Sequence, residues 1–419
     1  MTVLPDGWRW QSLNELAADG VFVDGDWVES KDQDPDGSVR LTQLADVGVA
    51  HFRDRSDRWL REDQAERLSC TRLVPGDILI ARMPDPIGRA CMVPEGIGAA
   101  VSVVDVAILR LRRTDVDARY VMWAINAPEF HQSVVAKESG TTRKRISRRN
   151  LGLLQVPLPS IEEQRRIVDL LEDHLSRLDV ASSQVRSSAD RLLQLRLGQL
   201  RRWRTESLEA SPDGPRALGE VAETSLGKML DAKRSSGEST AYLRNINVRW
   251  GRIDMSDVFT VPLSDQERAK FSLRQGDLLV CEGGEPGRAA IWESDQPMTF
   301  QKALHRVRVR PGADVLVPFL QLMLEEFVRT GRAADMFTGT TIKHLPQEKL
   351  RQIRIPLPPA HLQARVLAEA EAADSASARL DDELRQVEVR SQALRRSLLA
   401  VAFTGQLTRT APISEGLYV

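Results

Sequence analysis

The sequence predicts an α+β protein in which two similar globular units are joined by two long antiparallel heptad helices, a coiled coil, with an internal pseudo-twofold repeat. Three observations lead to this prediction: a passage that occurs twice at a fixed separation, a proline-bounded strand at the end of each copy, and a long heptad segment after each strand. With 419 residues, the chain is long enough for each unit to bury its own core.

The repeat is clearest in a Gly-Thr-Thr passage that is followed by a strand and a glutamine. The first copy contains Gly140, Thr141, Thr142, Val156, Pro157, Leu158, Pro159 and Gln164; the second contains Gly339, Thr340, Thr341, Ile355, Pro356, Leu357, Pro358 and Gln363. Each pair lies 199 residues apart. This period exceeds the roughly 20–50 residues of a solenoid repeat. The chain is therefore predicted to be a tandem duplication of a whole domain.

Each copy is predicted to be a mixed unit of about 150 residues. Buried strands are expected at residues 77–81 and 277–280, where short apolar runs follow a turn with glycine. Residues 305–310 alternate basic and apolar side chains, as in a half-buried strand, and short helices are expected at residues 120–125 and 319–328. Asp77 and Asp277 open the two buried strands, and we expect their carboxylates to bond backbone amides of the turn.

Residues 161–203 contain no proline and predict a helix of roughly 65 Å at ~1.5 Å per residue. Apolar or small side chains recur at alternating steps of three and four, at Val168, Leu171, Leu175, Leu178, Ser182, Val185, Ala189 and Leu192. The second copy has the same rhythm at Leu380, Leu384, Val387, Ser391, Leu394, Leu398 and Val401. Such heptad seams need a helical partner, and the duplication supplies two equal helices in one chain. An antiparallel pair within the chain is predicted; the alternative is two separate coiled coils with other chains.

Composition indicates a folded protein without a membrane segment. The net charge is −1, 42% of the residues are hydrophobic, and there is no run of ~18 apolar residues. Cys70, Cys91 and Cys281 are isolated, which favours a reducing compartment over a disulfide framework. The first residues lack the basic and apolar pattern of a secretion leader. A cytoplasmic protein is expected.

No catalytic motif is found in the sequence. It contains neither a Walker A loop nor a glycine-rich dinucleotide loop followed by a helix, and the Asn/Asp-Pro-Pro-aromatic signature of amino-methyltransferases is absent. The six histidines have no cysteine or carboxylate partners at metal-ligand spacing. The chain is therefore expected to have no catalytic residue, no metal site and no cofactor of its own.

The candidate functional residues are basic, amide and hydroxyl side chains, the types that read base edges and bind phosphates in DNA. Between residues 137 and 149, six basic residues accompany a single acidic one, so this segment could neutralise phosphates. The candidate DNA-binding residues are Lys137, Thr141, Thr142, Arg143, Lys144, Arg145, Asn245, Asn247, Arg249, Thr340, Thr341, Lys343 and His344. The set at 245–249 corresponds to Gln43 and its neighbours in the first copy. The alternative for the basic run is a solvated loop, and Arg82, Arg89, Arg288 and Lys302 could equally be ordinary surface charges.

The order of these features resembles the specificity (S) subunits of Type I restriction-modification systems. The likeness is carried by residues 4–8 (Leu-Pro-Asp-Gly-Trp), 156–159 (Val-Pro-Leu-Pro), 162–168 (Glu-Glu-Gln-Arg-Arg-Ile-Val) and 402–407 (Ala-Phe-Thr-Gly-Gln-Leu). It covers nearly the whole chain, and the order of its short motifs is duplicated at a fixed offset. The second copy departs from the pattern where Ala360, His361 and Leu362 replace the acidic residues before Gln363.

The resemblance implies a non-catalytic DNA-recognition subunit of a phage-defence system. Target recognition domains at residues 1–159 and 211–358 would each read one half of a bipartite site in double-stranded DNA. Spacer helices at residues 160–205 and 359–407 would set the spacing and dock two methyltransferase (modification) subunits, which restriction (translocase and nuclease) subunits would join. S-adenosylmethionine, ATP and Mg²⁺ would be bound by those partners. The alternative is a non-enzymatic scaffold with two peptide-binding domains on a coiled-coil spacer.

Overall fold

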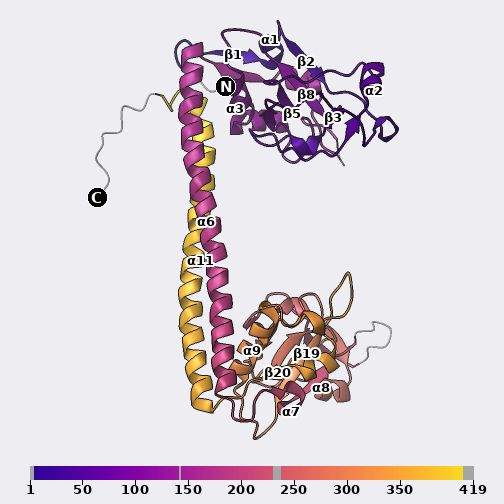
Figure 1. Cartoon of the computed structure of the whole chain (residues 1–419), viewed down its shortest axis with the longest axis vertical. Coiled ribbons are helices and arrows are strands. Elements are labelled where there is room, and N and C mark those ends of the chain that lie inside the picture. Colours follow the sequence, from indigo (N-terminus) through magenta and orange to yellow (C-terminus); the bar gives the residue numbers. More distant parts are fainter. Residues whose placement is uncertain (1–3, 141–142, 230–236, 409–419) are drawn as a thin grey trace, which may run out of the picture. The chain divides into compact units, whose positions relative to one another are not determined.

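The computed structural model describes residues 4–140, 143–229 and 237–408, and the chain divides into two compact units. Unit 1 comprises residues 1–185 and 386–419, and unit 2 comprises residues 186–385. The long helices α6 (Ile161–Glu209) and α11 (Ala360–Ala402) each contribute one segment to each unit (Figure 1). Both units combine helices with sheets, so the predicted fold class is confirmed.

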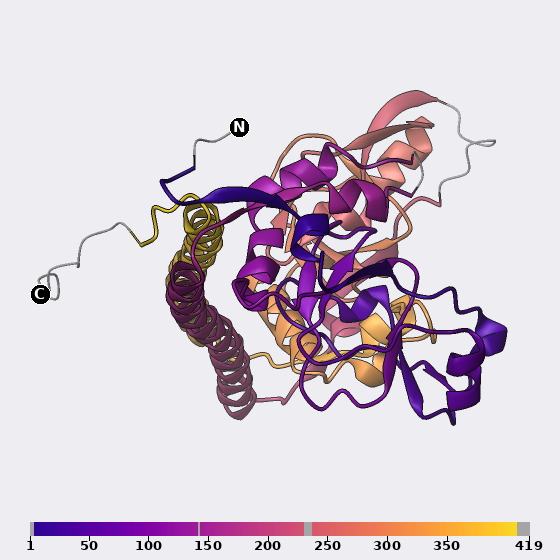
Figure 2. The same ribbon diagram turned by 90° about the horizontal axis from the view of Figure 1, so that it is seen from above.

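Unit 1 contains three groups of strands beside its helix segments. Its strands are β1 (Arg9–Ser12), β2 (Val21–Asp24), β3 (Val39–Thr42), β4 (Trp59–Leu60), β5 (Ile78–Ala81), β6 (Ala90–Met92), β7 (Ala100–Ser102), β8 (Val106–Arg110) and β9 (Gln155–Leu158). Its shorter helices are α1 (Leu13–Leu16), α2 (Glu62–Arg67), α3 (Ala118–Ile125), α4 (Pro128–Val135) and α5 (Arg148–Gly152), with 3-10 turns η1 (Ser30–Asp32) and η2 (Leu44–Asp46). The sheet orders are β2-β8-β5-β6, β4-β3-β7 and β1-β9. Within this unit, α2 lies far from the long helices in Figures 1 and 2.

Unit 2 repeats this topology and has two more short strands, which pair with each other. Its strands are β10 (Arg216–Ala217), β11 (Ala222–Leu226), β12 (Glu238–Leu243), β13 (Val248–Arg249), β14 (Arg252–Ile253), β15 (Phe259–Leu263), β16 (Leu278–Cys281), β17 (Ala289–Ile291), β18 (Thr299–Phe300), β19 (Leu304–Val309) and β20 (Arg354–Ile355). Its shorter helices are α7 (Leu218–Val221), α8 (Asp265–Phe271), α9 (Val317–Arg329) and α10 (Gln347–Gln352), with turns η3 (Asn245–Asn247) and η4 (Ala334–Met336). The sheet orders are β11-β19-β16-β17, β15-β12-β18, β10-β20 and β13-β14. The tandem duplication is thus a duplication of topology.

The strands predicted from short apolar runs, β5 and β16, lie between two hydrophobic cores. Ile78 of β5 packs with α3 and the long helices, whereas the next residue, Leu79, packs on the opposite face of the sheet. Leu278 and Leu279 of β16 are divided in the same way. A strand that is buried on both faces needs apolar side chains at every position, which explains why these runs do not alternate.

A buried glutamine fastens the start of each long helix to its globular unit. Gln164 accepts a hydrogen bond from the backbone N–H of Asp117 at 2.8 Å, and Gln363 accepts one from Leu316 at 2.9 Å. Each side-chain amide also donates to two backbone carbonyls, and neither residue is exposed. The glutamine of the repeated motif therefore has one structural role in both copies, and the altered residues before Gln363 leave it intact.

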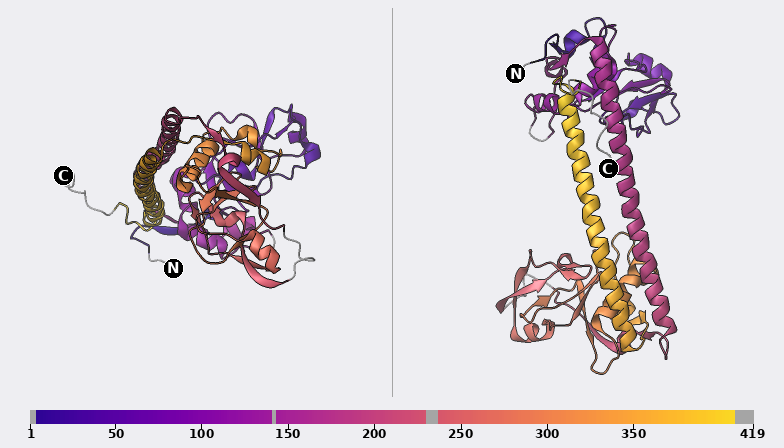
Figure 3. Two further views of the ribbon diagram at one scale, coloured as in Figure 1. Left: turned by 90° about the horizontal axis from the view of Figure 1, so that it is seen from below. Right: turned by 90° about the vertical axis from the view of Figure 1, so that its left-hand side faces the viewer.

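Within each unit the two long helices run antiparallel (Figure 3). In unit 1, Asp179 contacts Arg395 and Ser182 lies 3.2 Å from Ser391 between hydroxyl oxygens, so the numbering rises on α6 as it falls on α11. In unit 2 the facing ion pairs are Arg196 with Asp374, Arg202 with Glu369 and Glu206 with Arg365. The predicted antiparallel pairing within one chain is confirmed.

The predicted heptad seam is only partly correct. On α6 every predicted position is at least half-buried except Ala189, which is exposed. On α11, Leu380, Val387 and Leu394 are 46%, 43% and 51% exposed. The half-buried positions of this stretch are Leu384, Glu388, Ser391, Arg395 and Leu398. The helix α6 therefore covers a face of α11 that includes polar side chains as well as leucines. A heptad pattern alone does not say which row of apolar side chains the partner helix covers.

Candidate nucleic-acid interface

Three loops that are distant in the sequence meet in each unit, and we call this cluster the three-loop site. It comprises residues 43–47, 82–88, 139–140 and 143–145 in unit 1, and residues 244–248, 282–287 and 338–344 in unit 2. In unit 2, Asn245 donates its side-chain amide to the carbonyl of Gly283 at 3.1 Å, and Gly283 forms a β-bridge with His344. The structure thus brings together the two candidate sets around 245 and 340.

The same three loops are joined in unit 1 by arginine side chains. Arg89 donates to the carbonyls of Leu44 at 2.9 Å and Val47 at 2.6 Å, and also to Met83 and Pro86. Arg82 exchanges hydrogen bonds with Ile146, the residue that follows the Gly-Thr-Thr loop. The site therefore has one architecture in both units, although most of its side chains differ.

In each unit, a pair of backbone hydrogen bonds links the residues that flank the Gly-Thr-Thr motif. Ser139 pairs with Arg145 at 2.8 and 2.9 Å, and Thr338 pairs with His344 at 2.9 Å in both directions. Gly339 has φ +93°, and a Cβ at this position would lie 2.2 Å from the carbonyl oxygen of Ile342. Only glycine fits there, which explains the first residue of the repeated motif.

Most candidate residues of these hairpins point to solvent. Lys137, Arg143, Lys144, Arg145, Thr340, Thr341 and Lys343 are exposed, and Lys144 forms an ion pair with Glu138. His344 is half-buried, with its Nδ1 3.2 Å from a carboxylate oxygen of Glu282. Thr141 and Thr142 lie outside the described residues.

One candidate, Asn247, is placed in the interior rather than at the surface. It is 2% exposed, its side-chain oxygen accepts from the backbone of Arg244 at 2.9 Å, and its nitrogen donates to the carbonyls of Asp254 and Asp257. Its hydrogen-bonding groups are thus used within the domain, and we remove it from the residues that could touch a base. Asn245 and Arg249 are half-buried.

The arginines at 89 and 288, which could have been surface charges, are anchors of the site. Arg89 is 5% exposed, and burial lowers the pKa of its guanidinium. Arg288 donates to the carbonyl of Asn245 at 2.9 Å and forms an ion pair with Glu285. Arg89 holds the 3-10 turn η2 against the loop after β5, and Arg288 holds η3 against the loop after β16. Lys302, by contrast, is exposed.

Sequence reasoning missed a groove beside the three-loop site of unit 1. Its volume is about 850 Å³, and its lining includes Leu44 and Pro84 from two loops of the site, together with Asp26, Trp27 and Asp105. Trp27 is 71% exposed, an unusual state for so large an aromatic side chain. Burial raises the pKa of Asp26. An exposed indole beside carboxylates can stack on a base, while the carboxylates can accept hydrogen bonds from exocyclic amino groups.

Within residues 4–140, 143–229 and 237–408, no group of three or more histidine, cysteine or acidic residues is arranged to hold a metal ion. No helix among these residues is long and apolar enough to cross a membrane. The three-loop site offers hydrogen-bond donors, acceptors and positive charge.

The fold and the repeated site define a class of protein with two α+β units, each presenting one three-loop site, and a pair of long antiparallel helices. No family model matches the chain. It is 22% identical over 306 residues to the Type I restriction enzyme EcoBI specificity subunit of Escherichia coli, covering 67% of this chain and 64% of the relative. It is 23% identical over 295 residues to the EcoKI specificity subunit of E. coli strain K12, covering 67% of this chain and 63% of the relative. The matches thus span less than two thirds of these two relatives.

Solved structures share the fold over nearly the whole chain. A chain of a structure that describes complex assembly and conformational transition of the type I R-M system has a TM-score of 0.73 at 18% identity, covering 97% of this chain and 100% of that chain. The HsdS subunit from Thermoanaerobacter tengcongensis has a TM-score of 0.55 at 17% identity, covering 96% and 98%. The resemblance predicted from the short motifs is confirmed: the curated relatives are Type I specificity subunits, and the structural neighbours include an HsdS subunit.

Proposed function

We propose that this chain is the DNA-recognition subunit of a Type I restriction-modification complex, and that each unit reads one half of a bipartite site. The target recognition domains would be residues 1–159 and 211–358, and the spacer helices residues 160–205 and 359–407. The observation that carries this proposal is the presence of the three-loop site in both units. A site that is duplicated in architecture but different in side chains suits a target with two different halves.

The chemistry of the site supports DNA over a peptide as its ligand. Arg143, Arg145 and Lys343 are exposed cations on matching hairpins, and Thr340 and Thr341 add exposed hydroxyl groups. Cations and hydroxyls are the groups that hold phosphates, whereas peptide grooves use apolar pockets or free strand edges. The competing proposal, a peptide-binding scaffold, would need such a groove in both units.

We further propose that the helix pair docks two modification subunits. Leu195 on α6 and Leu394 on α11 are 199 residues apart, and they are 64% and 51% exposed. Leu195 lies in unit 2, in a shallow surface depression that also includes Arg191, Gly198 and Arg202, and Leu394 lies in unit 1. Two exposed leucines at equivalent positions of the repeat would accept two copies of one partner. In this proposal, S-adenosylmethionine, ATP and Mg²⁺ are bound by the modification and restriction subunits.

The decisive experiment is methylome sequencing of cells that express the chain with the modification subunits of its own genome. The proposal requires one bipartite methylated motif that disappears when the chain is deleted. Replacing Arg143, Lys144 and Arg145 with alanine should impair methylation at the whole site, and so should replacing Lys343 and His344 from the other unit. The matched control is alanine at Lys302, an exposed cation outside the hairpins. A motif that persists without the chain would favour the scaffold.

A further inference from the structure

A short hairpin follows the 3-10 turn of the three-loop site in each unit, and we call these hairpins the arms. Arm 1 comprises residues 47–56, and arm 2 comprises residues 248–257. Arm 1 is closed by a bridge between Val47 and Phe52, and arm 2 by the pairing of Val248 with Ile253. Only the first of the ten residues is the same in the two arms. The arms are therefore one structural element with two different sequences.

The tips of the arms share an unusual backbone conformation. Ala50 in arm 1 has φ +60°, and Gly251 at the matching position of arm 2 has φ +71°. The N–H of Ala50 donates to the carbonyl of Ala90 at 2.8 Å, and that of Gly251 donates to Ala289 at 3.1 Å. Each arm is thus held against the strand that follows the anchoring arginine.

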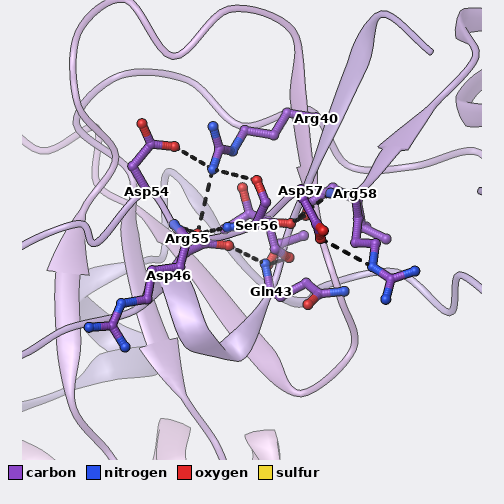
Figure 4. A network of polar contacts seen from close by, with 11 residues as sticks. Arg40, Gln43, Asp46, Asp54, Arg55, Ser56, Asp57 and Arg58 are labelled. Atoms are coloured by element: carbon purple, nitrogen blue, oxygen red, sulfur yellow. Dashed lines mark hydrogen bonds and ion pairs between the residues drawn. The ribbon is translucent and has the colours of Figure 1, made fainter. Parts of the chain in front are cut away.

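A buried polar side chain fixes the base of each arm, and the two units use opposite hydrogen-bond polarity. In unit 1, one carboxylate oxygen of Asp46 accepts the backbone N–H groups of Arg55 at 2.6 Å and Ser56 at 2.7 Å (Figure 4). In unit 2, the matching Asn247 donates its side-chain nitrogen to the carbonyls of Asp254 at 3.0 Å and Asp257 at 2.8 Å. Asp46 is fully buried, and Asn247 is nearly so. Because a carboxylate can only accept these bonds and the amide nitrogen can only donate, each residue fits only its own arm.

Each arm carries two arginines that form no ion pair within the described part of the chain. These are Arg53 and Arg55 in arm 1, and Arg249 and Arg252 in arm 2. Arg55 and Arg252 are exposed, whereas Arg53 and Arg249 are half-buried. The nearby Arg40 differs, because it pairs with Asp46 and Asp54 (Figure 4). The arginines occupy different positions on the shared hairpin, since Arg53 matches Asp254 and Arg252 matches His51.

We propose that the arms are a second DNA contact of each unit, in which these four arginines bind backbone phosphates and Asp46 and Asn247 act as positioning residues. The proposal rests on the proposed DNA-recognition function. Arginine forms strong, geometrically defined pairs with phosphate, and phosphate contacts fix the register from which a neighbouring loop reads bases. The different placement of the arginines would give each unit its own register on its own half-site.

The first test measures the salt dependence of binding between the full-length chain and mixed-sequence duplex DNA, by fluorescence anisotropy. Replacing Arg53 and Arg55 together with glutamine should weaken binding by about tenfold or more near 0.1 M KCl. The slope of log affinity against log salt should fall by about two, because each phosphate contact contributes ~0.9. Replacing Arg249 and Arg252 should have the same effect. Arg58→Gln is the matched control, because Arg58 is an exposed arginine already paired with Asp57.

The outcomes separate the arms from the function on which they depend. If the wild-type chain shows no salt-dependent binding, the DNA-recognition function fails and the arms fail with it. If the wild-type chain binds, and Lys343→Gln weakens binding while the arm variants keep the full slope, the arms are overturned and the function stands. A reduced slope for the arm variants, with an unchanged slope for Arg58→Gln, supports the arms, whatever the slope of Lys343→Gln.

The second test exchanges the buried residues in the variants Asp46→Asn and Asn247→Asp. In Asp46→Asn, the side-chain amide N–H group would face backbone N–H groups at the base of arm 1. In Asn247→Asp, a carboxylate oxygen would face the backbone carbonyls at the base of arm 2. In a double-mutant cycle, removal of Arg53 and Arg55 should cost less than about threefold in affinity in the Asp46→Asn background, because the arm is no longer positioned. A full tenfold loss in both backgrounds would mean that Asp46 only stabilises the fold. Asn247→Asp with Arg249 and Arg252 carries the same test should Asp46→Asn not fold.

Discussion

The carboxylate of Asp277 accepts hydrogen bonds from both Nε and Nη2 of Arg308, at 2.6 and 2.7 Å, and the Asp277 side chain is almost completely buried. The same carboxylate accepts the backbone N–H of Arg274 at 2.7 Å, so it closes the turn before β16 and neutralises a charge on β19. Asp77 and Arg110 repeat the arrangement in unit 1, at 2.7 Å for both contacts. The bond to the carboxylate raises the pKa of both guanidinium groups.

Replacing Asp277 with alanine should destabilise unit 2 by about 3 kcal/mol, the low end for a buried pair that loses one partner, because Arg308 is partly exposed. Asp77→Ala should have a similar effect on unit 1. Calorimetric or denaturant unfolding would measure both losses. Asp295→Ala removes an exposed carboxylate of unit 2 and should change stability by less than about 0.5 kcal/mol. Equal effects for buried and exposed carboxylates would contradict the role of the pair.

The sequence predicted these aspartates as turn residues but gave no sign of their arginine partners. The turn prediction is confirmed, since a Gly-Asp pair before an apolar run has a local cause. The ion pair depends on which strand lies next to β5 or β16, and that neighbour, β8 or β19, is about 30 residues away in the chain. Local sequence patterns therefore predicted the strands and helices, but they did not predict the ion-pair partners that come from a neighbouring strand of the sheet.

The prediction of the candidate site residues from the sequence was limited in the same way. Periodicity and charge drew attention to the hairpin cations, which are exposed. The same reasoning included Asn247, which is buried because the arm folds back over it, and omitted Arg53, Arg55 and Arg252, which stand in a segment with mixed charge. Whether a polar residue faces solvent is decided by the fold of the loop around it. The repeat carried more information, since the match of Asp46 with Asn247 follows once the strands are aligned.

The tips of the arms predict opposite effects of matched substitutions. Ala50 has a left-handed backbone conformation, which is sterically unfavourable for a residue with a Cβ atom. Ala50→Gly should therefore stabilise unit 1 by roughly 0.5–1 kcal/mol. Gly251→Ala should destabilise unit 2 by about 1 kcal/mol, although a Cβ there would meet only the Gln321 side chain at 3.7 Å. Thermal unfolding would measure both. The control is Gly198→Ala in α6, where a Cβ meets open space and alanine should stabilise by ~1 kcal/mol.

Unit 2 should lose stability as the pH falls below about 6.5, because of His305. This histidine is fully buried on β19, with Nε2 2.8 Å from the carbonyl oxygen of Leu345. Burial lowers its pKa, so between the folded pKa and 6.5 the unfolded chain binds more protons than the folded one. Stability is therefore complete above about pH 6.5 and decreases as the pH falls toward the folded pKa.

Thermal midpoints between pH 7.5 and 5.5 would measure this effect. His305→Gln, which can still donate to Leu345, should flatten the pH dependence. The other histidine of the unit 2 site is His344, 3.2 Å from Glu282, so His344→Gln is the comparison variant. Its midpoint should still fall with pH. A slope that His305→Gln leaves unchanged and His344→Gln removes would assign the pH dependence to the surface histidine.

The proposed docking surfaces predict a change in stoichiometry. Leu195→Glu and Leu394→Glu place a charge on exposed positions, so each should leave the stability of the chain within about 0.5 kcal/mol of the wild type. Each should remove one of two modification subunits from the assembled complex, and the double variant should remove both, as measured by native mass spectrometry. Leu153→Glu is the control, because Leu153 is 55% exposed outside the long helices. Two subunits bound to the double variant would exclude these surfaces.

The last prediction concerns the proposal that the helix pair fixes the gap between the two halves of the DNA site. Facing ion pairs of unit 2, Arg196 with Asp374 and Arg202 with Glu369, give the register in which residues of the two helices oppose each other. Removing residues 183–189 from α6 and 383–389 from α11 deletes one heptad from each helix at opposed positions, between the facing pairs Ser182 with Ser391 and Arg196 with Asp374, and keeps Leu195 and Leu394. Both faces stay in phase to within ~20°, and the pair shortens by about 10 Å.

A shortening of about 10 Å corresponds to about 3 bp of duplex at ~3.4 Å per base pair. Three base pairs also turn the DNA by roughly 100°, since one turn takes about 10 bp, whereas the helices turn by only ~20°. Distance and rotation then cannot both fit the original site, so its methylation should be lost. Methylome sequencing would show this, and circular dichroism would confirm that the shortened chain is folded. Undiminished methylation of the original motif with its original gap would show that the helices do not set the spacing.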